Sequence, residues 1–389
     1  MQLPVQFNLI KLLLKHPRYM WHLVTKKVRF SIRSRWAEHN IDHDDKVPLP
    51  LVYELTLTLK CNLRCHMCMQ WGDAGWCGTL GGGKLGEELD IDLINKIFAS
   101  GHSAKPSFIL HGGEPMLHSR FREIVLMLRE RRCFATVCTN GSLLDRFKDE
   151  INGNPYLDLL ISLDGLEEAN DSIRGKGTFK KVTDNIRLLR SLKKPPHMGL
   201  QFTILPQNVH VMHRFCKLAV DLGVDWVLLN PCWYLSEEQK KAYEDFLAKN
   251  FNAMPKTQLG YFDSYDLEIN EFVSQYKKIK RENWPIQISC YLKNPAEDMF
   301  DYVHSPNVFT GNTFCYKQWL RMDVTPQGNV TPCVRYPDLI FGDLKQEGVL
   351  QIWNSSAYEK FRKIVRCKTM PICNKCNCLY LYDAKRKHL

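Results

Sequence analysis

The chain has 389 residues, of which 44% are hydrophobic and 24% are charged, a composition typical of a globular protein with a sizeable core. No apolar run approaches the roughly 20 residues that span a bilayer, and no secretory signal is recognisable, so we expect a cytoplasmic protein. The fifteen cysteines are too few for a disulfide scaffold in a chain this long, and their clustering indicates metal binding.

The formal net charge of +11 is unevenly distributed, because residues 1–37 contain eight Lys and Arg residues and no Asp or Glu. Those charges alternate with aliphatic residues and Trp21, which predicts a basic amphipathic extension over residues 1–48. Two interpretations remain open. The extension is either a helical pair packed on the next domain with its basic face in water, or a segment, residues 1–40, that contacts an anionic membrane or substrate.

An alternating strand is predicted over residues 51–59, and three cysteines follow it directly. Cys61, Cys65 and Cys68 lie within eight residues, so one loop can wrap three thiolates around a metal centre but supplies no fourth. Structural zinc normally has four protein ligands, and a [4Fe–4S] cluster normally takes four cysteines. The spacing therefore indicates a cluster with one open iron for a substrate or cofactor. A structural zinc loop and three unrelated buried cysteines are the alternatives.

A helix is predicted over residues 87–100, followed by a short apolar strand that ends in Gly112, Gly113 and Glu114. Glycines permit close approach of the backbone to a ligand. Exposed carbonyl groups and the Glu114 carboxylate would suit a cationic amine.

Strand and helix patterns then alternate along the chain. The predicted helices are 119–131, 142–151, 178–192 and 208–222, and the strands between and after them are 134–138, 157–162, 198–205 and 226–230. Six strand–helix units in series predict a parallel sheet with its functional groups at the C-terminal strand ends. Six units rather than eight would leave a barrel open on one side.

Residues 236–308 carry two helical patterns and a short strand, 285–291, without a recognisable motif. Six cysteines lie beyond them: Cys315, Cys333, Cys367, Cys373, Cys376 and Cys378. Residues 319–333 predict a hairpin that brings the first two together, and a following helix delivers the close pair Cys373 and Cys376. Two such pairs indicate a second metal site, and a structural zinc ion is the alternative to a cluster.

The three-cysteine loop after a first strand resembles the signature of radical S-adenosylmethionine (SAM) enzymes, and the Gly-Gly-Glu-Pro turn resembles their motif for the SAM ammonium group. This resemblance implies an α/β fold with a partial (β/α)6 TIM-like barrel and a [4Fe–4S] cluster on Cys61, Cys65 and Cys68. Met67 stands where the family usually has an aromatic residue near the adenine. The implied SAM-binding residues are Met67, Gly112, Gly113, Glu114, Asn140, Ser162, Asp164 and Arg174. For Arg174, a salt bridge that fixes a loop is the alternative.

The C-terminal segment is similar to the SPASM/twitch domain of these enzymes, including the phrases that begin at Gly342 and Ile352. The full SPASM form needs seven cysteines and this segment has six, so the twitch form with one auxiliary [4Fe–4S] cluster matches better. The implied ligands are Cys315, Cys333, Cys373 and Cys376, with Cys367 or Cys378 able to replace one. The predicted parts are an extension (1–48), a barrel (49–235), a bridging region (236–308) and an auxiliary-cluster domain (309–389).

The resemblance implies an oxidoreductase that cleaves SAM reductively. The resulting 5′-deoxyadenosyl radical would remove hydrogen from a small, lipid-linked or nucleotide-linked anionic substrate, leading to dehydrogenation or epimerisation. A reductant such as flavodoxin or ferredoxin is implied, and no nucleic acid. An epimerase would need a thiol hydrogen donor, for which Cys232 at a strand end is the candidate, with a buried structural cysteine as the alternative. A peptide-modifying maturase and a non-catalytic metal-binding scaffold are the competing functions.

Overall fold

The computed structural model describes most of the chain. The described residues are 15–39, 46–73, 75–79, 86–101, 105–255, 257, 260–292, 294–305, 307–308, 315–367 and 369–376. The strands are β1 (Val52–Thr56), β2 (Ser107–His111), β3 (Ala135–Thr139), β4 (Leu157–Ser162), β5 (His197–Ile204), β6 (Trp226–Pro231), β7 (Gln287–Cys290), β8 (Arg321–Val324), β9 (Asn329–Thr331) and β10 (Gly342–Asp343).

The longer helices are α2 (Pro17–His39), α4 (Ile91–Ala99), α5 (Phe121–Glu130), α7 (Glu167–Arg174), α8 (Thr178–Arg190), α9 (Met212–Asp221), α10 (Glu237–Phe251), α11 (Ile269–Arg281), α12 (Pro295–His304) and α15 (Ser356–Cys367). The short helices are α6 (Lys148–Ile151), α13 (Lys317–Leu320) and α14 (Val349–Trp353). The 3-10 turns are η1 (Trp76–Thr79), η2 (Pro115–Leu117), η3 (Leu144–Phe147), η4 (Val209–Val211) and η6 (Pro371–Cys373).

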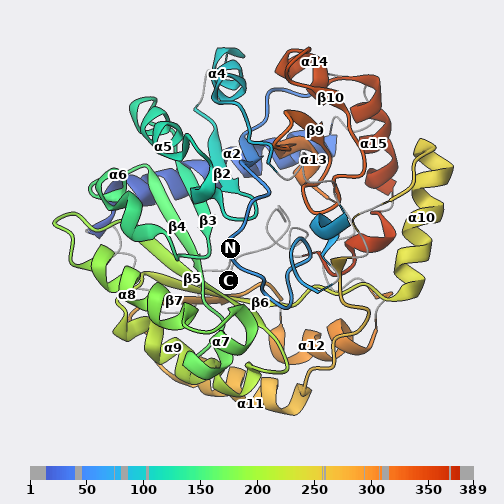
Figure 1. The fold of residues 1–389 in the computed structure, drawn as a ribbon. Helices are drawn as coiled ribbons and strands as arrows, with labels where there is room; N and C mark the ends of the chain where they lie inside the picture. Colours follow the sequence, from blue (N-terminus) through green and yellow to red (C-terminus); the bar gives the residue numbers. More distant parts are fainter. Residues whose placement is uncertain are drawn as a thin grey trace.

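All ten strands belong to one sheet with the order β10-β9-β8-β1-β2-β3-β4-β5-β6-β7. Every neighbouring pair from β8 through β1 to β7 is parallel, and only the β8–β9 and β9–β10 pairs are antiparallel. The sheet curves into an incomplete barrel with helices around its outside (Figure 1). The predicted α/β fold with a partial TIM-like barrel is confirmed.

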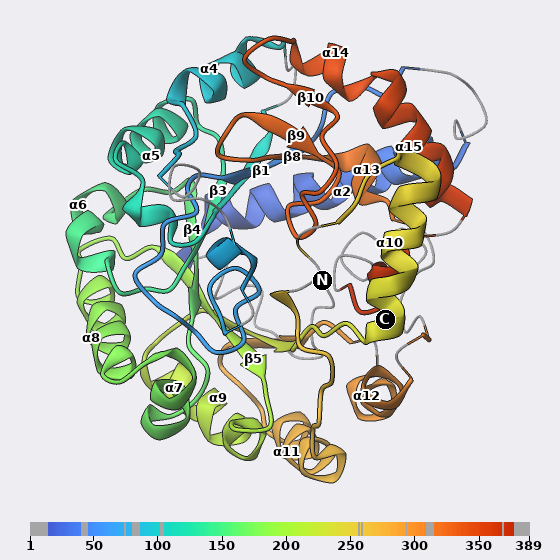
Figure 2. The ribbon, with the colours of Figure 1, turned by 45° about the vertical axis from the view of Figure 1, so that its right-hand side comes forward.

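The barrel sheet is wider than its six predicted units. The short strand of the bridging region pairs with β6 as β7, and the first strand of the C-terminal hairpin pairs with β1 as β8. Figure 2 shows β8, β9 and the C-terminal helices beside β1. One continuous sheet therefore runs through three of the four predicted parts, whose boundaries stay predictions.

Helix boundaries differ from the prediction where polar residues take other partners. The helix predicted from residue 87 begins at Ile91, because Asp90 is its N-cap and accepts a hydrogen bond from the backbone N–H of Asp92. Glu88 instead forms a β-bridge with Thr58 near the end of the first strand. The helix predicted over 142–151 is divided into η3 and α6.

Helix α2 crosses the N-terminal ends of the strands, on the far side of the barrel in Figure 1. The ring of Tyr19 stacks on His197 at the start of β5, with centroids 3.9 Å apart. The ring of His22 stacks on Phe134, the residue before β3, at the same distance. The predicted helical extension thus packs on the barrel and covers the end formed by the N-terminal ends of the strands. Residues 1–14 and 40–45 lie outside the described residues.

No helix in the described ranges combines the length and apolar character needed to cross a membrane.

Candidate cofactor and substrate site

The loop Cys61–Cys68 leaves the C-terminal end of β1. All three cysteine side chains are half-buried. Burial, with smaller contributions from the charges of Glu114, Cys65 and Cys68, raises the pKa of Cys61 to about 11. A free thiol with such a pKa is protonated at neutral pH, whereas a coordinating thiol is deprotonated by the charge of the metal. The three thiols are therefore close enough to act on one another and chemically suited to a cationic centre.

The Cys61–Cys68 loop supplies three thiols from one short segment. Among the described residues, no three His, Cys, Asp or Glu side chains converge as ligands of a single metal ion. Tetrahedral zinc requires such convergence, whereas the thiolates of a cubane bind different iron atoms. Three thiols in one loop are therefore compatible with a cluster.

The glycine turn after β2 packs on the chain that enters the cysteine loop. A Cβ atom on Gly112 would lie 2.2 Å from the carbonyl oxygen of Thr58, and one on Gly113 would lie 2.4 Å from that of Lys60. The N–H groups of Gly113 and Glu114 donate to these same oxygens over 2.9 and 2.7 Å. The two glycines therefore let the chain after β2 pack closely against the chain after β1.

The Glu114 carboxylate is fully buried and already holds the neighbouring strand end. It accepts hydrogen bonds from Thr139 Oγ1 (2.8 Å), the backbone N–H of Asn140 (2.7 Å) and that of Met116 (3.1 Å). Burial raises the pKa of Glu114 to about 7. Because a carboxylate has about four acceptor positions, one remains for an ammonium group.

Asn140 links the end of β3 to the cysteine loop, because its side-chain amide donates to Asn62 Oδ1 over 2.9 Å. Ser162 ends β4 and Met67 packs against the core, both half-buried. The C-terminal ends of β1 to β5 lie at one edge of the sheet, since these strands are parallel. The predicted SAM-binding residues therefore gather at that edge.

Arg174, the last residue of α7, lies against the cysteine loop. Its Nη2 atom is 2.6 Å from Oδ2 of Asp164, and its Nη1 atom donates to Sγ of Cys65 over 3.7 Å. The backbone N–H of His66 donates to the carbonyl oxygen of Ile173 over 3.0 Å. The salt bridge proposed as the alternative for Arg174 is present, and it holds the guanidinium group beside a cluster-loop thiol.

The second cysteine group assembles from segments far apart in the sequence. Cys376 packs with Cys315 and Cys373, and after burial the charges of Cys315 and Cys333 raise the pKa of Cys373. These are the four expected ligands. The Cys367 side chain and all of Cys378 lie outside the described residues, so their alternative role stays a prediction.

Sequence reasoning missed Arg335, which lies beside the auxiliary cysteines. Its guanidinium carbon is 3.7 Å from the centroid of Trp233, a residue that packs with Cys376. Burial lowers the pKa of His111 at the end of β2; the charges of Glu54 and Asp323 oppose this, and that of Arg335 adds to it. The charge of Arg335 is therefore felt at a strand end of the barrel.

Tyr261 connects this region to the first cysteine loop. Its hydroxyl lies 2.7 Å from Sδ of Met69 and donates to the carbonyl oxygen of Arg335 over 3.4 Å. The rings of Trp233 and Tyr261 are stacked at 6.5 Å. The only sequence signals were an arginine two residues after an expected ligand, Cys333, and a tryptophan next to Cys232.

Cys232 is 3% exposed, and its thiol donates to the carbonyl oxygen of Trp233 over 3.6 Å. Burial raises the pKa of Cys232 to about 12, so the thiol stays protonated. That state suits a hydrogen donor and a structural cysteine equally.

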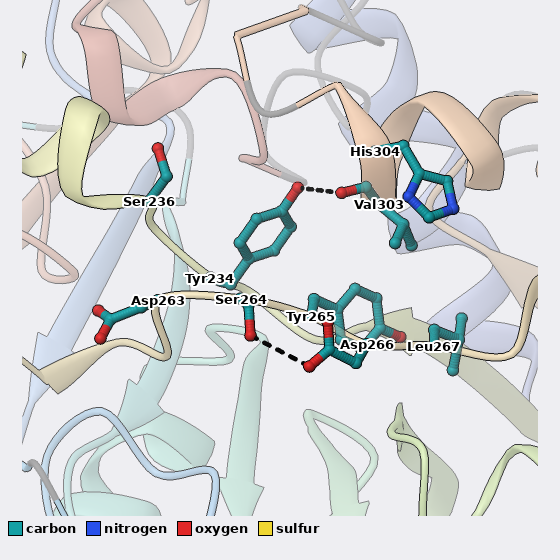
Figure 3. Close-up of a pocket in the computed structure, with 9 residues that line it drawn as sticks. All are labelled: Tyr234, Ser236, Asp263, Ser264, Tyr265, Asp266, Leu267, Val303 and His304. Carbon is teal, nitrogen blue, oxygen red and sulfur yellow. Dashed lines mark hydrogen bonds between the residues drawn. The ribbon is translucent and has the colours of Figure 1, made fainter.

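A separate cavity of about 220 Å³ lies beside the loop after β6 (Figure 3). Tyr234 and Tyr265 form its apolar part, and Asp263 and Asp266 lie at its edge. None of the predicted site residues lines it, and its carboxylates disfavour an anionic ligand. It is not the candidate site.

Comparison with known proteins gives two family matches. Residues 55–219 match the radical SAM superfamily, and residues 315–377 match the SPASM iron–sulfur cluster-binding domain. The chain is 24% identical to the tungsten-containing aldehyde ferredoxin oxidoreductase cofactor-modifying protein of Pyrococcus furiosus, over 83% of this chain and 86% of that protein. It is 33% identical to the Fe-coproporphyrin III synthase of Methanosarcina barkeri, over 52% of this chain and only about half (48%) of that protein.

The fold is similar to the crystal structure of Streptococcus suis SuiB bound to the precursor peptide SuiA. The TM-score is 0.59 at 13% identity, covering 84% of this chain and 69% of SuiB, so the likeness concerns the fold alone. The fold and the family matches agree. The chain therefore belongs to the radical SAM superfamily, with a [4Fe–4S] cluster, SAM and a SPASM domain with auxiliary iron–sulfur binding as its cofactor equipment.

Proposed function

We propose that this radical SAM enzyme is an oxidoreductase that acts on a small or carrier-linked anionic molecule. Arg335, stacked on Trp233 beside the auxiliary cysteines, is the observation that supports this most directly. A planar guanidinium held over an aromatic ring is well suited to bind a carboxylate or phosphate group. It would orient such a substrate toward the bound cofactor.

Cys61, Cys65 and Cys68 would hold the SAM-binding cluster. When bound, the reduced cluster and SAM supply a radical that removes a hydrogen atom from an unactivated carbon. Around them, the chain's own residues bind and orient. The backbone carbonyls of the Gly112–Gly113 turn and the remaining acceptor position of Glu114 would receive the SAM ammonium group.

Other strand-end residues would complete SAM binding. Arg174 and Ser162 are proposed to face the carboxylate and ribose, with Asp164 orienting the Arg174 guanidinium through the 2.6 Å contact. Asn140 would hold the cysteine loop in register through Asn62. Met67 would pack near the adenine, where a polarizable thioether replaces an aromatic ring.

The second cysteine group supports the oxidoreductase assignment. Cys315, Cys333, Cys373 and Cys376 are proposed to bind one auxiliary [4Fe–4S] cluster with no open iron, which leaves it to accept or relay an electron. Trp233 packs between this group and Arg335 and would exclude water from the path between them. A flavodoxin or ferredoxin is the proposed reductant.

The substrate class can be tested without knowing the substrate. Metabolite extract from the source cells is divided into anionic, neutral and peptide fractions, and each is added to anaerobically reconstituted enzyme with SAM. We expect the anionic fraction alone to stimulate 5′-deoxyadenosine release. Arg335→Gln should raise the amount needed for half-maximal stimulation roughly tenfold or more, because a hydrogen bond to a charged group contributes about 1.5–3 kcal/mol.

The matched control is Arg187→Gln, since Arg187 is an arginine on the exposed surface of α8. It should behave like the unaltered enzyme. Stimulation by the peptide fraction alone would identify a peptide-modifying maturase instead. If no fraction and no added reductant yields 5′-deoxyadenosine, the proposed activity is wrong.

We expect Cys232 to be structural, which favours dehydrogenation over thiol-dependent epimerisation. Cys232→Ala should leave the product and its uptake of deuterium from D2O unchanged, because the thiol is buried and hydrogen-bonded to its own loop. Mass spectrometry of the product measures both. Cys216→Ala, at a fully buried cysteine of α9, is the control for packing loss. Deuterium uptake by the unaltered enzyme that disappears only in Cys232→Ala would establish Cys232 as a hydrogen donor.

A further inference from the structure

The exposed face of helix α2 carries a row of apolar side chains that an ordinary surface helix would bury. Four of its apolar side chains point away from the protein: Trp21 (71% exposed), Val24 (52%), Val28 (53%) and Ile32 (64%). Their spacing of three, four and four residues places them in one stripe along the helix. Scattered exposed apolar residues are normal, whereas a contiguous stripe marks a binding surface.

Three cationic side chains of α2, those of Lys26, Arg29 and Arg33, lie toward the barrel instead. Arg29 donates to the carbonyl oxygen of Lys105 over 3.0 Å, just before β2, and Arg33 donates to that of Pro48 over 2.7 Å. Burial lowers the pKa of Lys26 to about 8. Arg29 and Arg33 thus donate to backbone carbonyl groups just before β2 and β1. Part of the basic face expected in water therefore lies against the barrel, whereas Arg18, Lys27 and Arg35 stay exposed.

Two of these contacts relate the inward face to the apolar stripe. The helix cannot rotate to bury Trp21 and Val28 without withdrawing Arg29 and Arg33 from their acceptors. Within the part of the chain that the structure describes, the stripe therefore stays exposed.

We propose that this face of α2 docks the enzyme on an anionic lipid bilayer. Arg18, Lys27 and Arg35 are exposed beside the stripe, and residues 1–37 contain no Asp or Glu. Apolar side chains, an interfacial tryptophan and flanking cations are the combination that binds an anionic membrane surface. A second copy is disfavoured, because two such faces would bring like charges together.

Docking through α2 also sets the orientation of the enzyme. The helix covers the N-terminal strand ends, whereas the cysteine loop and the glycine turn lie at the C-terminal ends. The barrel mouth would face away from the bilayer. The enzyme would thus be held at the membrane while it takes its substrate from the aqueous side.

The test is co-sedimentation of the full-length holoenzyme with two kinds of vesicle, one of phosphatidylcholine and one of equal parts phosphatidylcholine and phosphatidylglycerol. We expect binding to the anionic vesicles, weakened by added salt, and little binding to the neutral ones. Trp21→Ser/Val28→Ser should lower the partition coefficient roughly tenfold or more, because two apolar anchors are removed.

Met254→Ser/Phe300→Ser is the matched control, since these side chains are 62% and 56% exposed elsewhere on the surface. It should bind like the unaltered protein. Both variants should retain the circular dichroism spectrum and iron content of the unaltered enzyme. Absence of binding to anionic vesicles, or equal binding by the α2 variant, would overturn the proposal. The proposal would also be overturned, in favour of a dimer, if the sedimentation coefficient rose with protein concentration and this rise were lost only in the α2 variant.

Discussion

Replacing Asp323 with asparagine is expected to lower the unfolding free energy by about 3–5 kcal/mol, because it removes the anion from a buried ion network. Asp323 is fully buried in β8. Its Oδ2 atom contacts Lys317 Nζ and accepts a hydrogen bond from the backbone N–H of Val334 over 2.9 Å. Its Oδ1 atom lies 3.0 Å from Arg321 Nε. The substitution would leave two buried cations without their shared partner.

The network lies at the join between the C-terminal segment and the barrel. Arg321 also contacts Glu54 of β1, the strand that pairs with β8. Loss of Asp323 should therefore release the β8–β9 hairpin, and with it the auxiliary cysteines, before the remainder of the barrel unfolds. Urea unfolding followed by circular dichroism measures the total change, and hydrogen exchange of β8 locates it.

Asp184→Asn is the control for this prediction. Asp184 contacts Lys180 and Arg187 on the outer surface of α8, with its side chain about half exposed. Solvent screens such contacts, so no measurable change in stability is expected. A similar loss in both variants, or none in Asp323→Asn, would show that the buried network does not hold the hairpin on the barrel.

Iron content should separate the two cysteine groups. Anaerobically reconstituted enzyme is expected to hold about eight iron atoms, since each [4Fe–4S] cluster contributes four. Cys61→Ala/Cys65→Ala/Cys68→Ala should retain about four, because it removes every ligand in one loop. Cys373→Ala/Cys376→Ala should also retain about four, and it should still cleave SAM in the presence of a strong reductant.

Several outcomes would contradict this assignment. About twelve iron atoms in the unaltered protein would indicate a second auxiliary cluster that uses Cys367 or Cys378. Zinc without iron in every variant would show that both cysteine groups are structural zinc sites. Iron analysis combined with acid-labile sulfide and electron paramagnetic resonance distinguishes these cases.

Much of the barrel could be predicted because its signals are local. Strand 157–162 coincides with β4, and the predicted helix 178–192 ends two residues beyond α8. Alternating or 3.6-residue apolar periods depend only on which face of a segment is buried. The Cys61–Cys68 spacing is likewise local, because three ligands in one loop meet whatever the rest of the chain does.

Features that depend on distant partners were not predictable in the same way. The hairpin around residues 319–333 was expected, but not that its first strand would extend the barrel beside β1. That pairing joins segments about 270 residues apart and is decided by Glu54 and Arg321 together. Its place two residues after Cys333 was a weak signal for Arg335, since the position of the side chain depends on Trp233 across the fold.

Helix α2 separates the two kinds of information most clearly. The sequence by itself determined a basic helix with two different faces, along with the parallel strands and both sets of cysteines. Only the tertiary structure decided which face of α2 meets the protein. The spacing of hydrophobic residues shows that a helix has two different faces. Which of the two faces packs on the protein depends on the groups that it meets there. Here the barrel end offers backbone carbonyl groups, so Arg29 and Arg33 turn inward and the apolar stripe is left outside.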